Sequence, residues 1–178
     1  MALDLSARLR ENACVVHEVG RREAPAAIVD RVIERARGGV VAVAPADPLV
    51  AELALVAAMR DRDVTLLLPD APDWTDALPN ATVGLTGAAL AVTEPAALAV
   101  VAAPHVPRAI SLLPPVHVCV VRASDIVPDL AGAIASFAGA LPSALTWIGG
   151  PSRTGDLEMI TTLGVHGPTV VEVVIIDG

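Results

Sequence analysis

Lysine and tyrosine are absent from this 178-residue chain. Every one of its 12 basic residues is therefore an arginine. Without lysine the chain has no P-loop lysine, no pyridoxal-phosphate Schiff base and no lysine nucleophile. The lack of tyrosine removes a further general acid. Several common kinds of active site are thus excluded before any motif is considered.

Cysteine is scarce. Cys14 and Cys119 lie far apart, and neither belongs to a Cys-x-x-Cys pattern. The sequence therefore predicts neither an iron–sulfur cluster nor a structural zinc site, and we interpret both cysteines as small apolar residues in strands. The four histidines are scattered without acidic partners at ligand spacing, so no metal site is expected. His17 and His105 receive no role.

Positive charge is also limited. The formal net charge is -8 and the pI is about 4.8, and there is no basic run. Nucleic acid is not an expected partner, because such binding depends on neutralising phosphates. No apolar run reaches the ~20 residues that a membrane span needs, and residues 1–10 lack the apolar core of a secretory signal. We therefore expect a cytoplasmic protein without a membrane segment.

Hydrophobic residues make up 54% of the chain and charged residues 18%, as in proteins whose strands are covered on both faces. The length suits a single domain over residues 1–178. Strand-like and helix-like segments alternate, which predicts an α/β protein with a mostly parallel, doubly wound sheet. Closely spaced β-type runs at 83–86, 89–93 and 98–101 predict a small β-rich insertion. The expected strands are 14–19, 40–44, 64–68, 116–121, 145–148 and 170–176, and the expected helices are 25–37, 48–60, 126–138 and 155–163.

Polar groups are concentrated near the C-terminus, in the string GGPSRTGDLE at residues 149–158. A glycine turn follows the strand expected at 145–148, and Thr154 is positioned to cap the helix expected at 155–163. Its first turn would contain Asp156 and Glu158, which favour the helix dipole. Backbone N–H groups at such a helix start can bind an anion.

Two interpretations of these polar residues stay open. Arg153, beside the expected helix start, is able to hold a phosphate or carboxylate in bidentate fashion, or to pair with the two nearby acidic residues. His166 lies between Gly164 and Gly167 in a loop, where it would contact a ligand or cap the preceding helix. His117 alternates onto the same strand face as Cys119, which favours a histidine hydrogen-bonded within the core.

Glu94 is the only charged residue between Asp76 and Arg108. It stands in an apolar stretch, where an ionised carboxylate is costly unless it is paired or hydrated. A raised pKa with a catalytic role and a solvated turn glutamate before Pro95 are equally compatible with the sequence.

The string GPSRTGDLEMITTLGVHGP resembles the C-terminal signature of the LUD domain family, also called the lactate-utilisation protein C family. The segments VGLTGA with AVTE, and SLLPPVHV, are similar in the same order, so the resemblance covers about residues 14–177. It implies the CoA-transferase-like fold that the family shares with ribose-phosphate isomerase and glucosamine-phosphate deaminase.

The resemblance also implies roles for individual residues. Glu94 would be catalytic, since related CoA transferases carry their acyl-accepting glutamate in a comparable motif, although the chain continues with Pro95 and lacks the glycine of the family's Glu-x-Gly turn. His117, Asp156 and Glu158 would have supporting positions. The implied ligand-binding residues are Thr86, Gly87, Gly150, Ser152, Arg153, Thr154, His166 and Gly167.

The leading hypothesis is an accessory or ligand-binding component of L-lactate utilisation. Iron–sulfur partner proteins would oxidise lactate to pyruvate, and this chain, which has no cofactor of its own in this hypothesis, would bind a small carboxylate or phosphate-bearing ligand. A homodimer stays open. The alternatives are a stand-alone CoA-transferase-like or sugar-phosphate-type enzyme using Glu94, and a non-catalytic structural module.

Overall fold

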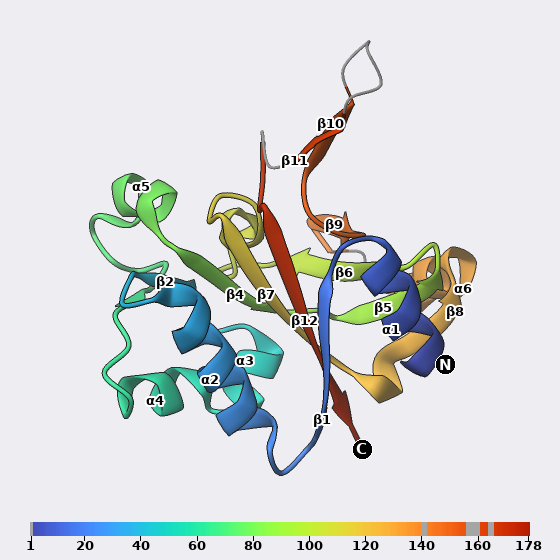
Figure 1. The fold of residues 1–178 in the computed structure, drawn as a ribbon, viewed down its shortest axis with the longest axis horizontal. Helices are drawn as coiled ribbons and strands as arrows, with labels where there is room; N and C mark the ends of the chain where they lie inside the picture. The colour runs from blue at the N-terminus through green and yellow to red at the C-terminus, as the bar shows by residue number, and fades with distance from the viewer. Residues whose placement is uncertain (1, 140–141, 156–160, 164–165) are drawn as a thin grey trace.

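The computed structural model describes residues 2–139, 142–155, 161–163 and 166–178. Its centre is a six-stranded sheet whose neighbouring strands all run parallel (Figure 1). This arrangement confirms the predicted α/β class with a mostly parallel central sheet. In spatial order the strands are β1 (Val15–Gly20), β12 (Val170–Asp177), β7 (Val116–Arg122), β4 (Val83–Gly87), β2 (Val41–Val43) and β3 (Leu66–Leu67).

Helices cover one face of this sheet (Figure 1). Residues Ile28, Val29 and Val32 recur at helical spacing, so their buried side chains form one apolar stripe that packs against the sheet. Val118 and Val120, which are alternate residues of β7, point to the same side of the sheet and pack with this stripe of α2. The helices of this layer are α2 (Ala24–Ala36), α3 (Pro48–Glu52) and α4 (Leu55–Arg60).

A second sheet and an N-terminal helix cover the opposite face. Leu5 and Leu9 of helix α1 (Ala2–Glu11) are fully buried there, against Cys119 and Val121 of β7. The order of the second sheet is β8 (Ile126–Asp129), β5 (Leu90–Glu94), β6 (Ala97–Ala102) and β9 (Ala144–Ile148). Two of the three runs predicted as a β-rich insertion, 89–93 and 98–101, form β5 and β6 of this second sheet, whereas the run at 83–86 is β4 of the central sheet.

The helix expected at residues 126–138 is only partly correct. Ile126 and Val127 are β-branched and pair with β5 as the edge strand β8, where Pro128 removes no needed hydrogen bond. The helix α6 (Leu130–Ser136) begins later, where the carboxylate of Asp129 accepts a hydrogen bond from the Gly132 amide at 2.7 Å.

The helix expected at residues 155–163 is wrong within the described residues. Strands β10 (Arg153–Gly155) and β11 (Thr161–Leu163) form an antiparallel pair there, with Thr154 opposite Thr162. Threonine is β-branched and favours extended backbone, which explains why the pair outweighs a weak helical period.

Short elements complete the chain. The helix expected at residues 48–60 is divided into α3 and α4 at Ala54, which adopts a left-handed conformation with φ 50°. No helix among the described residues is both long and apolar enough to span a bilayer. The remaining short helices are α5 (Trp74–Ala77), η1 (Leu78–Asn80), η2 (Arg108–Ser111) and η3 (Ala123–Asp125).

Candidate functional site

Four of the expected ligand-binding residues, Gly150, Ser152, His166 and Gly167, line one pocket of about 190 Å³. We call it the Ser152 pocket. Two segments distant in sequence form its mouth, and the Ser152 amide ties them together by donating to the Pro168 carbonyl at 2.9 Å. The end of β9, Ser111 of η2 and Val171 at the start of β12 close its other sides.

The glycines of this pocket allow the chain to pass close to its neighbours. A Cβ at position 150 would lie 2.5 Å from the Asn12 carbonyl oxygen, and one at position 167 would lie 3.1 Å from Cβ of Ser152. Glycine is therefore required at position 150, and tight packing holds Ser152 in place. The pocket presents a half-buried hydroxyl from Ser152 and an exposed imidazole from His166, both of which can hydrogen-bond a small polar ligand.

The neighbouring polar residues are arranged differently from the expectation. Thr154 belongs to strand β10, so it does not cap a helix, and the helix dipole that was expected to attract an anion is not formed by the described residues. Arg153 is exposed and its Nη2 donates to the Asn12 carbonyl at 2.9 Å, which ties it to the end of α1. Asp156 and Glu158 lie outside the described residues.

Thr86 and His117 form a buried pair on the sheet face behind the Ser152 pocket. Thr86 Oγ1 lies 2.8 Å from His117 Nε2 and 3.8 Å from the sulfur of Cys119. His117 is in register with Val171 of the neighbouring strand β12, and Val171 lines the Ser152 pocket. Burial lowers the pKa of His117 to about 4, so the ring is neutral at neutral pH. Its Nδ1 has no hydrogen-bond partner among the described residues.

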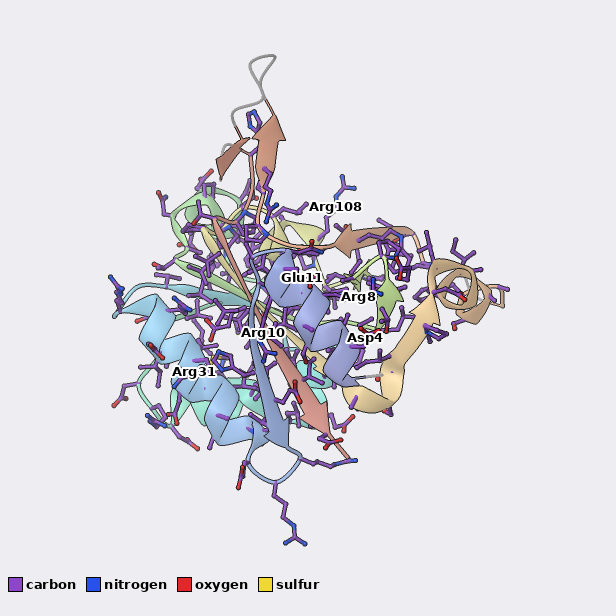
Figure 2. All side chains as sticks on the ribbon, turned by 45° about the vertical axis from the view of Figure 1, so that its right-hand side comes forward. Asp4, Arg8, Arg10, Glu11, Arg31 and Arg108 are labelled. Carbon is purple, nitrogen blue, oxygen red and sulfur yellow. The ribbon has the colours of Figure 1, made fainter. Side chains whose placement is uncertain are left out.

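Glu94 ends β5 and belongs neither to the Ser152 pocket nor to the Thr86–His117 pair. Its side chain is 69% exposed, and its Oε2 lies 2.8 Å from Nη1 of Arg8, which also contacts Asp4 one turn earlier on α1 (Figure 2). It does not line the Ser152 pocket. A solvated ion pair supplies no dry environment that would activate a carboxylate, so a catalytic role for Glu94 stays a prediction.

Gly87 lies at the end of β4 and lines a different cavity, together with Asp47 and Arg122. Neither Asp47 nor Arg122 was expected to be a site residue. The signal that was available is positional, because all three residues follow or end strands whose carboxyl ends meet at one edge of a parallel sheet.

A buried carboxylate was also missed. Glu172 of β12 is 1% exposed, and its oxygens contact Nε2 of His17 at 2.7 Å and Nε of Arg35. These side chains come from β1, α2 and β12, so the ion pairs join three elements. The signal was a single glutamate within the apolar run VVEVVII, since a buried charge requires partners.

The two cysteines are buried and unpaired with each other. Burial raises the pKa of Cys14 to about 11 and that of Cys119 to about 12. Both are therefore thiols at neutral pH, the form that does not ligate metals. In the described part of the chain, no group of three or more histidine, cysteine or acidic residues is arranged to hold a metal ion.

Known proteins are similar to this chain in sequence and in fold. The lactate utilization protein C of Deinococcus radiodurans is 35% identical over 114 residues, which cover 62% of this chain and 54% of that protein. The lactate utilization protein C of Geobacillus kaustophilus is 32% identical over 146 residues, 75% of this chain and 61% of that protein. The matches thus span little more than half the length of these relatives.

A solved structure extends the likeness to the fold. The crystal structure of a DUF162 family protein from Deinococcus radiodurans superimposes with a TM-score of 0.73 and 25% sequence identity, covering 98% of this chain and 95% of that chain. The family profile described as LUD domain matches residues 4–176. Because that match spans nearly the whole sequence, the chain belongs to the LUD domain family.

Proposed function

We propose that this protein takes part in lactate utilisation as a ligand-binding component, and that the Ser152 pocket holds a small carboxylate such as L-lactate. The observation that carries the proposal is the convergence of Gly150, Ser152, His166 and Gly167 on one pocket. The names of the relatives, lactate utilization protein C, supply the process.

The pocket suits a small polar acid on physical grounds. The Ser152 hydroxyl and the His166 imidazole can donate a hydrogen bond to a carboxylate or a hydroxyl group, and both residues line the pocket. Ile148 and Val171 contribute apolar side chains to the lining, which suits the methyl group of lactate. The volume of about 190 Å³ favours small molecules over nucleotides.

The finer form of the proposal assigns redox chemistry to partner proteins. Oxidation of L-lactate to pyruvate needs an electron acceptor, and we place it on iron–sulfur partners because both cysteines of this chain are isolated and buried as thiols. The proposal includes a cytoplasmic location and the CoA-transferase-like fold that the sequence resemblance implies. A homodimer is the oligomeric state to test by light scattering.

Calorimetric titration with L-lactate and pyruvate tests the pocket. We expect binding by the parent protein, and at least fivefold weaker binding by Ser152→Ala and His166→Ala because each removes a polar contact. His105→Ala is the matched control, since His105 is exposed and lies outside the pocket. Glu94→Ala should also bind as the parent does, which separates this proposal from an enzyme that depends on Glu94.

Two results would contradict the proposal. One is the absence of any lactate or pyruvate binding by the folded parent protein. The other is unchanged binding by both pocket variants, which would move the ligand elsewhere. The process itself is tested in the source bacterium, where deletion of the gene should abolish growth on L-lactate, and normal growth would refute the assignment.

A further inference from the structure

A cavity of about 340 Å³ lies at the carboxyl edge of the central sheet. Gly87 ends β4 there, Arg122 ends β7, and residues 46–49 follow β2. Open α/β sheets bind ligands outside the carboxyl ends of their strands, and typical ligand cavities measure about 300–1,000 Å³. We call this cavity the edge pocket.

The wall of the edge pocket is mostly apolar. Only two of its 12 lining residues, Asp47 and Arg122, are charged. The end of β6 and the turn after it supply the outer wall, through Val101, Ala103 and Val106. Leucine, proline and alanine side chains supply most of the remainder. A ligand that fills this space therefore gains most from an aliphatic body.

The carboxylate of Asp47 is occupied by hydrogen bonds within the protein, and these hold the pocket wall in place. Asp47 is 4% exposed. Its Oδ1 accepts hydrogen bonds from the amides of Leu49 and Val50 at 3.0 and 3.3 Å, and its Oδ2 accepts from the Gly87 amide at 2.8 Å. A Cβ at position 87 would lie 2.6 Å from Oδ1, so only glycine allows this contact. The carboxylate thus joins α3 to β4 and leaves ligand recognition to the arginine.

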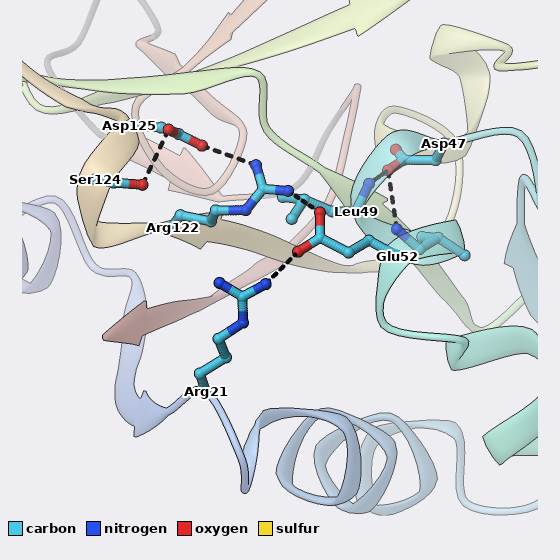
Figure 3. Close-up of polar contacts among 8 residues, drawn as sticks. Arg21, Asp47, Leu49, Glu52, Arg122, Ser124 and Asp125 are labelled. Carbon is cyan, nitrogen blue, oxygen red and sulfur yellow. Dashed lines mark hydrogen bonds and ion pairs between the residues drawn. The ribbon is translucent and has the colours of Figure 1, made fainter. Parts of the chain in front are cut away.

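Arg122 has donors beyond those that its ion pairs use. Its Nη1 lies 3.1 Å from Oδ2 of Asp125, and its Nη2 contacts Glu52, which Arg21 reaches from the other side at 3.3 Å (Figure 3). A guanidinium carries five N–H groups, and these two bonds need only two of them. The Arg122 side chain is 33% exposed and lines the edge pocket, so its remaining N–H groups can donate to one further anion.

We propose that the edge pocket is a second ligand site, which binds an aliphatic monocarboxylate with its chain in the apolar cavity and its carboxylate on Arg122. Two carboxylates already neighbour this arginine, so the charge interaction is moderate and the chain supplies most of the affinity. A two-carbon acid should therefore bind poorly and an eight-carbon acid well. The site is separate from the Ser152 pocket and shares no lining residue with it.

A calorimetric series with acetate, butyrate, hexanoate and octanoate tests this site. Each pair of added methylenes should strengthen binding about tenfold while the chain is still being buried. Octanol, which has the chain without the charge, should bind at least tenfold more weakly than octanoate. Ala103→Phe should abolish the binding, because Ala103 is exposed and lines the cavity, so the larger ring occupies the ligand's space.

Arg122→Met should weaken octanoate binding at least tenfold and leave octanol binding unchanged. Arg21→Met is the matched control, because Arg21 pairs with the same Glu52 yet does not line the edge pocket. That variant should bind octanoate within twofold of the parent. Thermal unfolding checks that each variant folds, and Ala103→Phe decides the question if Arg122→Met does not.

The proposal fails if octanoate does not bind the parent, if affinity is independent of chain length, or if Ala103→Phe binds as the parent does. Ser152→Ala should leave octanoate binding unchanged. If octanoate binds and lactate does not, only the proposal for the Ser152 pocket is contradicted. If lactate binds and octanoate does not, only the proposal for the edge pocket is contradicted.

Discussion

His117 places an imidazole in the core between β4 and β12, where the Thr86 hydroxyl is its hydrogen-bond partner and the Cys119 thiol in turn contacts that hydroxyl. A consistent set of donors has Nε2–H donating to Thr86 and the Thr86 hydroxyl donating to Cys119. Protonation of the ring would place a charge in this apolar layer. Folding therefore selects the neutral form, and the pKa of His117 is lowered from 6.5 to about 4.

This shift makes stability depend on pH in a defined window. The unfolded chain binds a proton at His117 below about pH 6.5 while the folded chain stays neutral to about pH 4, so stability falls as the pH drops between these values. Between pH 7.5 and 5 the loss should be about 2 kcal/mol. Urea unfolding of His117→Asn should lack this component, whereas His105→Asn should keep the parent's slope. Equal slopes for the parent and His117→Asn would contradict the assignment.

At the same scale, the sequence indicated which residues gather but not how. The string around Ser152 and the glycine–histidine string after it were expected to share a site, and the structure brings Ser152 and His166 to one pocket. The site was expected to be built on the start of a helix at Thr154. That expectation depended on a weak helical period, which strand pairing outweighs. Arg122 escaped notice because nothing local marks it, and only the parallel register brings it beside Gly87.

Among the secondary-structure elements, η2 is positioned by a close approach to β4. A Cβ at position 84 would lie 1.9 Å from the Ile110 carbonyl oxygen, so glycine alone permits this contact. The element carries Ser111, which lines the Ser152 pocket. The spacing between β4 and η2 therefore helps to determine the shape of the pocket, although Gly84 is not part of it.

Gly84→Ala should accordingly destabilise the protein by about 2 kcal/mol or more, because the added methyl group forces η2 away from β4. Gly20→Ala is the control, since no atom lies within 4 Å of a Cβ there, and its free energy of unfolding should stay within about 0.5 kcal/mol of the parent's. Chemical denaturation measures both. A Gly84→Ala protein as stable as the parent would show that η2 is held elsewhere.

The helices and strands that were predicted correctly are those with the strongest local sequence patterns. Apolar strands such as β7 and β12 and the amphipathic helix α2 match the expected ranges closely, because buried runs and a 3.6-residue period are unambiguous. The segment at 126–138 was assigned to one helix, since its strand β8 exists only through pairing with β5. The break at Ala54 has no sequence signal that we recognise.

In the whole molecule, one sheet contributes to two separate hydrophobic layers. Successive residues of β7 alternate between them, so Val118 and Val120 pack with the helices whereas Cys119 and Val121 pack with α1 and the second sheet. The same alternation holds in β12, where Val174 and Ile175 face opposite ways. Both layers pack on the same central strands, so loss of packing in one layer exposes strands on which the other layer depends. This favours unfolding as one cooperative unit.

The two tryptophans can be used to test this cooperativity, because they lie in different hydrophobic clusters. Trp74 packs against a small cluster that includes Leu67 and Ile110, and Trp147 packs against the second sheet beside Leu90. In Trp147→Phe and Trp74→Phe, fluorescence reports on one of these two clusters at a time, because the sequence contains only these two tryptophans. If the chain is a single domain, unfolding curves from the two variants should coincide in midpoint and slope with circular dichroism of the same samples. Two separated midpoints, with one tryptophan exposed while helix and sheet content persist, would show that the second sheet and the cluster around Trp74 unfold as independent units.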